Sequence, residues 1–400
     1  MMGTKLSPLL VLCRHRPCRQ LSRSFASASA TLLKQSEQSS SPLPTATQRQ
    51  RTALVFPGQG SQLVGMGRDF YDSSPAARAV FNQVDEALGE PLSHLIFDGP
   101  ARTLELTRNA QPAILATSIA IVRAIEEALG KDRYISQLAA YSLGHSLGEY
   151  SALVATGSLK LADAARLVRL RGEAMQAAVD ALPPRHRPTA MTALVLPRRQ
   201  TKESKEVEGM LTAFENVVKD VQDALEVEGD GDIVQVANLN SSFQVVISGT
   251  KRGVDIASRA LQDRRVAARA VDLPVSAPFH CSLMAPAADA LRPALDDVPF
   301  APPASTIVAN VTARPIANVN DIPTLLVRQA TAPVQWHRSV MWCKNEAHVN
   351  EWISVGPGRV ISNLLKKELP AKEATVLSVA SPDEVIALCD HFKSRSGSGV

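Results

Sequence analysis

The chain has few cysteines and no long apolar run. Its 400 residues include five cysteines, with no Cys-x-x-Cys pair and no histidine at zinc-ligand spacing. We therefore expect a reducing compartment and no structural metal. No stretch reaches the ~18 consecutive apolar residues that a transmembrane helix needs, so we expect no membrane partner. Hydrophobic residues still make up 45% of the chain, which is enough to bury a large core.

Acidic residues are missing from the N-terminal segment. The first 36 residues contain six of the 43 Lys and Arg side chains and no acid, so the remaining bases are slightly outnumbered by the 39 acids. The formal charge of +4 is therefore due to this segment. Because the rest of the chain has no overall basic field, we expect no nucleic-acid partner.

The same N-terminal segment has the composition of a targeting signal. It is rich in Arg and Ser, lacks acids and contains Leu-Leu-Val-Leu at 9–12. This combination is typical of a mitochondrial transit peptide, so we expect import into the mitochondrial matrix; the alternative is a cytosolic tail. Residues 36–51 are mainly Ser, Gln, Pro and Thr, which indicates a linker. We assign residues 1–50 to the transit peptide and linker.

Strand and helix patterns alternate from about Thr52 onward. Alternation of this kind predicts a mostly parallel sheet with helices on both faces. The expected strands span 52–56, 138–143, 306–309, 351–355 and 375–379, and the expected helices span 75–88, 111–129, 147–156 and 162–181, with another beginning at 360.

A different pattern interrupts this alternation after three prolines at 183, 184 and 188. Its order of strand, helix, two strands, helix and strand is that of a ferredoxin-like subdomain. The elements are expected at 190–196, 206–226, 233–239, 244–249, 251–263 and 267–273. We therefore assign 51–187 and 275–395 to a large subdomain and 188–274 to a small one. Residues 198–232 carry ten acids and five bases, so we interpret the first small-subdomain helix as a solvated face.

Ser146 is the first candidate catalytic residue. It lies in Gly144-His145-Ser146-Leu147-Gly148, between an expected strand and an expected helix. A sharp turn from strand to helix exposes a serine hydroxyl at the sheet edge, and its flanking glycines leave room for the tight turn. The sequence therefore predicts a nucleophile elbow; the alternative is an ordinary turn bounded by glycines.

His280 is the candidate base for this serine. It follows the small subdomain directly, at the return to the main sheet, and an imidazole has a suitable pKa to accept a hydroxyl proton. No acid is obviously able to orient it, so a backbone carbonyl is expected to hold Nδ1–H in a dyad. The alternative is a core histidine. The backbone N–H groups of Leu147 and of the Gly58-Gln59-Gly60 loop are candidates for an oxyanion hole.

Arg171 is the candidate for selecting the acyl group. It lies on the expected helix over 162–181, in a partly apolar segment. If its guanidinium faces the pocket, it can bind a carboxylate with two hydrogen bonds. The alternative is an arginine that faces solvent, as we expect for Arg166 and Arg169.

Several separated motifs resemble one known family. They are Phe56-Pro57-Gly58-Gln59-Gly60-Ser61-Gln62, Asn109-Ala110-Gln111-Pro112-Ala113, the segment from Gly144 to Tyr150, Arg171-Gly172, Phe279-His280, Pro333-Val334-Gln335-Trp336 and Val355-Gly356-Pro357-Gly358. Together they resemble the malonyl-CoA:acyl carrier protein transacylases, from about Thr52 to the last strand. The resemblance implies an α/β-hydrolase-like large subdomain with an inserted ferredoxin-like subdomain.

The resemblance also implies roles for individual residues. Ser146 would be malonylated, His280 would be its base, and Arg171 would pair with the malonyl carboxylate. The oxyanion hole would use the N–H groups of Gln59 and Leu147. The remaining implied roles are pocket lining for Gln111, orientation of the histidine by the main-chain carbonyl of Gln335, and a loop near the thioester for Asn238 and Asn240.

The implied reaction moves a malonyl group from malonyl-CoA to the thiol of acyl carrier protein, supplying fatty acid synthesis without a further cofactor. A serine hydrolase or thioesterase shares the elbow and the base and is the second reading; a noncatalytic binder of carrier protein is the third. Because the resemblance implies an acidic carrier, we expect a basic docking patch. Its candidate residues are Lys251, Arg252, Arg264 and Arg265.

Overall fold

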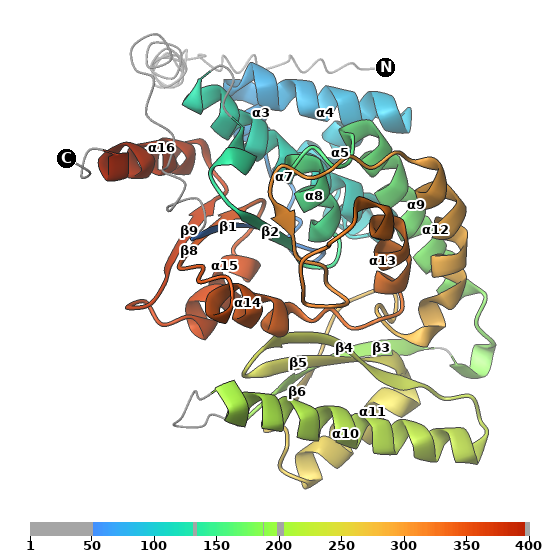
Figure 1. Cartoon of the computed structure of the whole chain (residues 1–400). Coiled ribbons are helices and arrows are strands. Elements are labelled where there is room, and N and C mark those ends of the chain that lie inside the picture. Colours follow the sequence, from blue (N-terminus) through green and yellow to red (C-terminus); the bar gives the residue numbers. More distant parts are fainter. Residues whose placement is uncertain (1–50, 131–133, 187, 198–203, 397–400) are drawn as a thin grey trace, which may run out of the picture. The chain divides into compact units, whose positions relative to one another are not determined.

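The computed structural model describes residues 51–130, 134–186, 188–197 and 204–396 (Figure 1). The expected transit peptide and linker at 1–50 lie outside these residues. Within them, the chain forms a five-stranded sheet and a separate four-stranded sheet. In this part of the chain, no helix is both long and apolar enough to cross a membrane.

The five-stranded sheet is parallel and has the order β7-β2-β1-β8-β9. Because parallel strands end at the same edge, the segments that follow β1, β2 and β7 lie next to one another. The strands are β1 (Thr52–Phe56), β2 (Tyr141–Gly144), β7 (Thr306–Ile307), β8 (Glu351–Val355) and β9 (Thr375–Val379).

Helices pack on both faces of this sheet, as the alternation of strands and helices predicts. Leu54 and Phe56 of β1 join one hydrophobic core, whereas Ala53 and Val55 join another on the opposite face. Successive side chains of a strand point to opposite faces, so all of β1 is buried. The helices are α3 (Arg68–Ser73), α4 (Pro75–Leu88), α5 (Leu92–Asp98), α6 (Ala101–Leu104), α7 (Thr107–Leu129), α8 (Gly148–Ala155), α9 (Leu161–Asp180), α12 (Ala285–Asp297), α13 (Ile322–Gln329), α14 (Trp336–Asn345), α15 (Val360–Glu368) and α16 (Pro382–Ser396).

The four-stranded sheet is antiparallel and has the order β4-β5-β3-β6. It is formed by β3 (Thr189–Val195), β4 (Val234–Ser241), β5 (Gln244–Thr250) and β6 (Arg269–Asp272), with α10 (Ser204–Glu228) and α11 (Lys251–Asp263) on one face (Figure 1). The other face contributes Met191, Ala193, Ala237 and Val246 to a core shared with the large sheet. The expected fold class, a mostly parallel α/β unit with an inserted ferredoxin-like unit, is confirmed.

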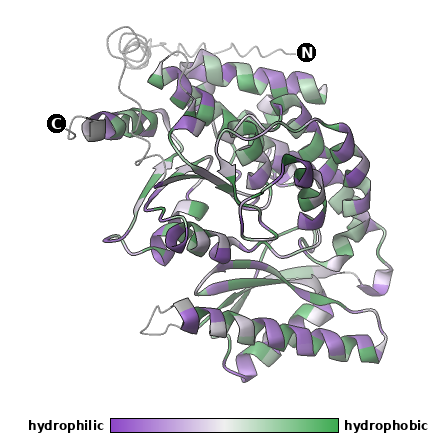
Figure 2. Cartoon of the chain, in the orientation of Figure 1, coloured by the Kyte–Doolittle hydropathy of each residue, from purple (hydrophilic) through white to green (hydrophobic). Residues whose placement is uncertain are grey.

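Two expectations about helices differ from the structure. Helix α7 begins at Thr107, four residues before the expected start, and Pro112 lies inside it. The expected start followed the apolar content of the segment, which begins later than the helix itself. At Pro112 the helix lacks one backbone N–H donor. Helix α10 is more than a solvated face, since Leu211, Phe214 and Val218 are buried in the small core. Figure 2 shows hydrophilic and hydrophobic residues interleaved along α10.

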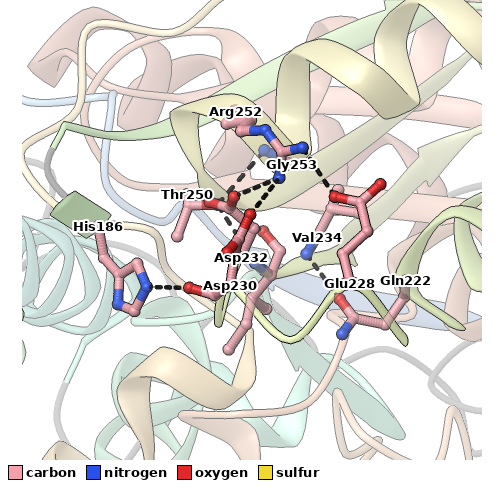
Figure 3. A network of polar contacts seen from close by, with 10 residues as sticks. His186, Gln222, Glu228, Asp230, Asp232, Val234, Thr250, Arg252 and Gly253 are labelled. Atoms are coloured by element: carbon pink, nitrogen blue, oxygen red, sulfur yellow. Dashed lines mark hydrogen bonds and ion pairs between the residues drawn. The ribbon is translucent and has the colours of Figure 1, made fainter. Parts of the chain in front are cut away.

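A polar network joins the end of α10 to α11 and the neighbouring strands (Figure 3). Asp232 is buried, and its carboxylate accepts hydrogen bonds of 2.7 Å from Thr250 Oγ1 and from Arg252 Nη1. Arg252 Nη2 also donates to Glu228 Oε2 at 2.7 Å. The guanidinium therefore neutralises the acids that gather at this turn, which fastens the helices to the sheet.

Candidate active site

Ser146 lies in a tight turn between β2 and α8. Its φ of 51° is in the left-handed region, which a residue with a side chain rarely adopts. A Cβ on Gly144 would lie 1.8 Å from the carbonyl carbon of Gly148, and one on Gly148 would lie 2.3 Å from the carbonyl oxygen of Phe56. Only glycine fits at both positions, so the motif forms the expected elbow.

Asn310, in the segment after β7, holds this strained turn. Its Oδ1 accepts from the backbone N–H of Ser146 at 2.7 Å, and its Nδ2 donates to the carbonyl of Gly144 at 2.6 Å. The side chain is 3% exposed. Two hydrogen bonds from one buried amide thus fix both sides of the elbow, which offsets the strain at Ser146.

His280 faces the Ser146 hydroxyl. Its Nε2 lies 2.8 Å from Ser146 Oγ, and its Nδ1 lies 2.8 Å from the carbonyl oxygen of Gln329. Because a carbonyl only accepts, Nδ1 carries the proton and Nε2 is free to accept the proton of the serine. Ser146 and His280 therefore form a dyad in which a backbone carbonyl orients the imidazole.

The carbonyl expected for this role was that of Gln335, and this expectation is wrong. The carbonyl of Gln335 accepts from Ser339 N and Oγ at 2.9 Å, at the start of α14. Gln329 is the last residue of α13, and the C-terminal carbonyls of a helix have no acceptor role within it. A free carbonyl at the end of α13 is thus available to His280.

The environment of His280 favours the neutral imidazole. Burial lowers its pKa to about 3, and the positive charge of Arg171 acts in the same direction. A neutral imidazole is the form that accepts a proton, so His280 is ready to act as a base at neutral pH.

The loop after β1 packs against the elbow. A Cβ on Gly58 would lie 2.4 Å from the carbonyl oxygen of His145. The side chain of Gln59 donates to Thr107 Oγ1 at 3.1 Å, which anchors the loop to α7. Among the described residues, the backbone N–H groups of Gln59 and Leu147 donate to no protein acceptor. Both therefore remain free for an oxyanion beside Ser146.

Arg171 is buried in the site and does not face solvent. It is 2% exposed, and its Nη2 lies 3.1 Å from Ser146 Oγ. Its Nη1 donates to Gln111 Oε1 at 2.9 Å and its Nη2 to Gln329 Oε1 at 3.0 Å. Its Nε has no hydrogen-bond partner in the described part of the chain, where no carboxylate lies within ion-pair distance. A buried cation whose hydrogen-bond partners are two neutral amides and a hydroxyl is suited to an anionic ligand.

The site opens into a cavity of about 600 Å³ between the two sheets. Ser146, His280 and Arg171 line it, together with Asn238 and Asn240 of β4. Asn240 Oδ1 lies 2.8 Å from His145 Nε2, and backbone hydrogen bonds join β4 to Val334 of the large subdomain. These contacts place Asn240 beside the elbow, and both asparagines lie in strand β4 and not in the expected loop.

Three residues of the site were missed in the sequence. Gln329 and Asn310 are far from Ser146 in the sequence and reach it only in the folded chain. Glu149 was not considered, although it belongs to the elbow motif. A usable signal existed for Asn310, because it closely follows an expected strand and polar residues at that edge of a parallel sheet often serve a site. Gln329 had no comparable signal.

Known proteins are similar to this chain over most of its length. A family model described as an acyl transferase domain matches residues 53–187. The malonyl CoA-acyl carrier protein transacylase of Bacillus subtilis (strain 168) is 39% identical over 336 residues, which cover 84% of this chain and 95% of that protein. The crystal structure of an acyl-carrier-protein-S-malonyltransferase from Bartonella henselae has a TM-score of 0.72 and 39% identity, covering 85% of this chain and 99% of that chain.

A further similar structure contains a type II PKS acyl-carrier protein in complex with its malonyl-transacylase. It has a TM-score of 0.72 and 35% identity, and the match covers 85% of this chain and 99% of that chain.

The lowered pKa of His280 predicts how stability depends on pH. An unfolded histidine takes up a proton below about pH 6.5, whereas folded His280 resists protonation down to a pKa of about 3. Because the unfolded protein takes up a proton that the folded protein does not, the free energy of unfolding decreases as the pH falls below 6.5. Between pH 7.5 and pH 5, wild type should lose ~2 kcal/mol more unfolding free energy than His280→Gln, as measured in urea. Parallel losses in the two proteins would contradict the assignment.

Proposed function

This chain belongs to the malonyl CoA-acyl carrier protein transacylase family, and from this premise we propose that Ser146 carries the malonyl group during the reaction. The protein is an acyltransferase that transfers malonyl from malonyl-CoA to acyl carrier protein for fatty acid synthesis. The observation that best supports the role of Ser146 is the position of its Oγ, 2.8 Å from His280 Nε2 and 3.1 Å from Arg171 Nη2.

The first half-reaction forms an ester on the enzyme. His280 Nε2 takes the proton of Ser146 while Oγ attacks the thioester carbonyl of malonyl-CoA. The N–H groups of Gln59 and Leu147 donate to the oxyanion of the tetrahedral intermediate. As the intermediate collapses, the carbon–sulfur bond breaks, and the CoA sulfur leaves with the proton from His280.

The second half-reaction reverses these steps with a different thiol. The phosphopantetheine thiol of the carrier protein gives its proton to His280 and attacks the malonyl ester. Ser146 then leaves and recovers its proton from His280. The same base and oxyanion hole serve both halves, because each passes through the same type of intermediate.

Arg171 selects the acyl group by its charge. The malonyl carboxylate would accept from the guanidinium, whose Nε has no hydrogen-bond partner among the described residues. An acetyl group would leave the buried cation without an anion, which costs several kcal/mol. This arrangement favours a dicarboxylic acyl group over a simple one.

A serine hydrolase remains the alternative function, since it needs the same dyad. A site built to bind the carboxylate of its cargo favours transfer of one defined acyl group instead. Rapid release of malonate from the acyl-enzyme without a thiol acceptor would support the hydrolase. The third hypothesis, a noncatalytic binder, requires that Ser146 be dispensable. The hydrogen bond between Ser146 and His280 gives no support to that hypothesis.

The expected basic docking patch needs correction. Lys251 pairs with Asp255, and Arg264 Nη1 lies 2.9 Å from Asp220 Oδ2. Arg252 belongs to the acidic turn in Figure 3. Since acids of the same subdomain neutralise these three side chains, they provide little free charge for an acidic carrier. Of the four candidates, Arg265 alone is exposed and has no ion-pair partner among the described residues.

We also propose that the enzyme acts in the mitochondrial matrix. The support is the composition of residues 1–36, which carry six basic side chains and no acid, upstream of the matched acyl transferase domain that begins at residue 53.

An import assay tests this location. Residues 1–50 fused to a reporter protein should enter isolated mitochondria and become resistant to added protease, only while the membrane potential is maintained. A fusion in which Arg14, Arg16, Arg19 and Arg23 are changed to Glu serves as the control and should stay outside. A wild-type fusion that remains sensitive to protease would rule out the transit peptide.

Loss of Arg171 should weaken the preference for malonyl over acetyl. Arg171→Ala is expected to lower kcat/KM for malonyl transfer about a hundredfold more than for acetyl transfer, because ~3 kcal/mol of charged hydrogen bonding is lost only with malonyl. Steady-state transfer to carrier protein from the two CoA esters measures both values. Arg166→Ala, on the exposed side of the same helix, is the control. Equal losses for the two acyl groups would remove Arg171 from this role.

A further inference from the structure

Glu149 is a buried acid that the mechanism above does not use. It lies in the first turn of α8, three residues after Ser146, and is 1% exposed. Its Oε2 accepts from Gln329 Nε2 at 2.6 Å and from the backbone N–H of Asn310 at 3.3 Å. A carboxylate in this position costs free energy of burial, so it requires an explanation.

Gln329 connects this carboxylate to the groups of the active site. Its Nε2 donates to Glu149 and to the carbonyl oxygen of Ser146, the latter at 3.1 Å. Its Oε1 accepts from Arg171 Nη2 at 3.0 Å, and its backbone carbonyl accepts from His280 Nδ1. One buried glutamine therefore contacts the nucleophile, the base and the acyl-selecting cation.

The donor and acceptor pattern fixes which way the amide of Gln329 points. A carboxylate only accepts, so Glu149 requires the NH2 group of the amide, and the oxygen must then face Arg171. A flipped amide would direct its NH2 group at the guanidinium, where two donors face each other without an acceptor. Glu149 thus determines the side of the amide that Arg171 meets.

The electrostatic interaction between Glu149 and Arg171 favours the same arrangement as these hydrogen bonds. Burial lowers the pKa of Arg171, whereas the negative charge of Glu149 raises it. Burial raises the pKa of Glu149 to about 7, against the effect of the Gln329 and Asn310 hydrogen bonds and the charge of Arg171. In its ionised form, Glu149 therefore compensates the charge of the guanidinium across the amide of Gln329, without an ion pair.

We propose that Glu149 is a positioning residue for acyl selectivity: through Gln329 it holds Arg171 in the orientation that receives the malonyl carboxylate. An amide between the two charges has a specific advantage. A carboxylate in direct contact with Arg171 would compete with the substrate, whereas Gln329 leaves Nε and part of the charge available. This inference rests on the proposed function, in which Arg171 binds that carboxylate.

The competing explanation is that Glu149 only stabilises α8. An acid in the first turn of a helix interacts favourably with the helix dipole and needs no connection to Arg171. Such a role would affect all acyl groups equally, since α8 supports the elbow in every case. Selectivity therefore distinguishes the two explanations, whereas total activity does not.

The test is the malonyl-to-acetyl ratio of kcat/KM in Glu149→Gln. This variant keeps the shape of the side chain but removes its charge and lets both amides flip. We expect the ratio to fall about tenfold, the loss that corresponds to one hydrogen bond of a charged group. In the Arg171→Ala background the same change should leave the ratio unaltered, because the effect acts through Arg171.

Asp163→Asn is the matched control, since it removes a first-turn acid from α9, the helix that carries Arg171. It should leave the ratio unchanged. If Glu149→Gln does not fold, Gln329→Met replaces it, because methionine keeps the backbone carbonyl for His280 and removes only the amide. A tenfold loss of selectivity is expected there as well.

Two results would overturn the inference. One is an unchanged malonyl-to-acetyl ratio in Glu149→Gln, whether or not total activity falls, and the other is the same loss of selectivity with and without Arg171. The acyl preference of the wild-type enzyme shows whether the inference about Glu149 or the proposed function itself has failed. If the wild-type protein shows no preference for malonyl, the role of Arg171 is refuted. If the wild-type protein prefers malonyl and Glu149→Gln has the same preference, only the role of Glu149 is refuted.

Discussion

The site depends on one buried cation that has no anion in contact with it. Arg171 is 2% exposed, and neutral amides from Gln111 and Gln329 accept its hydrogen bonds. Burying an unpaired guanidinium costs several kcal/mol, and a carboxylate that arrives with the substrate recovers part of this cost. The free energy stored in this way is available only to an acyl group with a free carboxylate. Because Arg171 also contacts Ser146 Oγ, selection of the cargo occurs at the reacting atom.

The fold supplies the rigidity that such a site needs. Ser146 and His280 both have positive φ values, 51° and 61°, so each is held in a conformation that it would not adopt alone. The segments after β1, β2 and β7 meet at one edge of the parallel sheet, where Asn310 ties the elbow to its neighbour. Gln329 then links the base and the cation at the end of α13. Contacts from several elements therefore compensate the backbone strain at the two catalytic residues.

Much of this organisation could be predicted from the sequence, because local patterns carry it. The elbow around Ser146 is marked by Gly144 and Gly148, and most strands and helices follow from hydrophobic periodicity. The residue that orients His280 could not be found in this way, since neither spacing nor residue type marks the free carbonyl at the end of a helix. Gln335 was chosen for its motif, but the contact belongs to Gln329. Basic side chains such as Arg252 were likewise misread, because a sequence does not show which acids fold against them.

Intact-protein mass spectrometry after mixing with malonyl-CoA or acetyl-CoA tests most directly whether the cation and the nucleophile act together. The account predicts that malonyl-CoA rapidly adds one malonyl group, that peptide mapping locates it on Ser146, and that acetyl-CoA reacts far more slowly. Ser146→Ala should gain no acyl group. Equal rates of modification by the two esters, or an adduct that persists in Ser146→Ala, would contradict it.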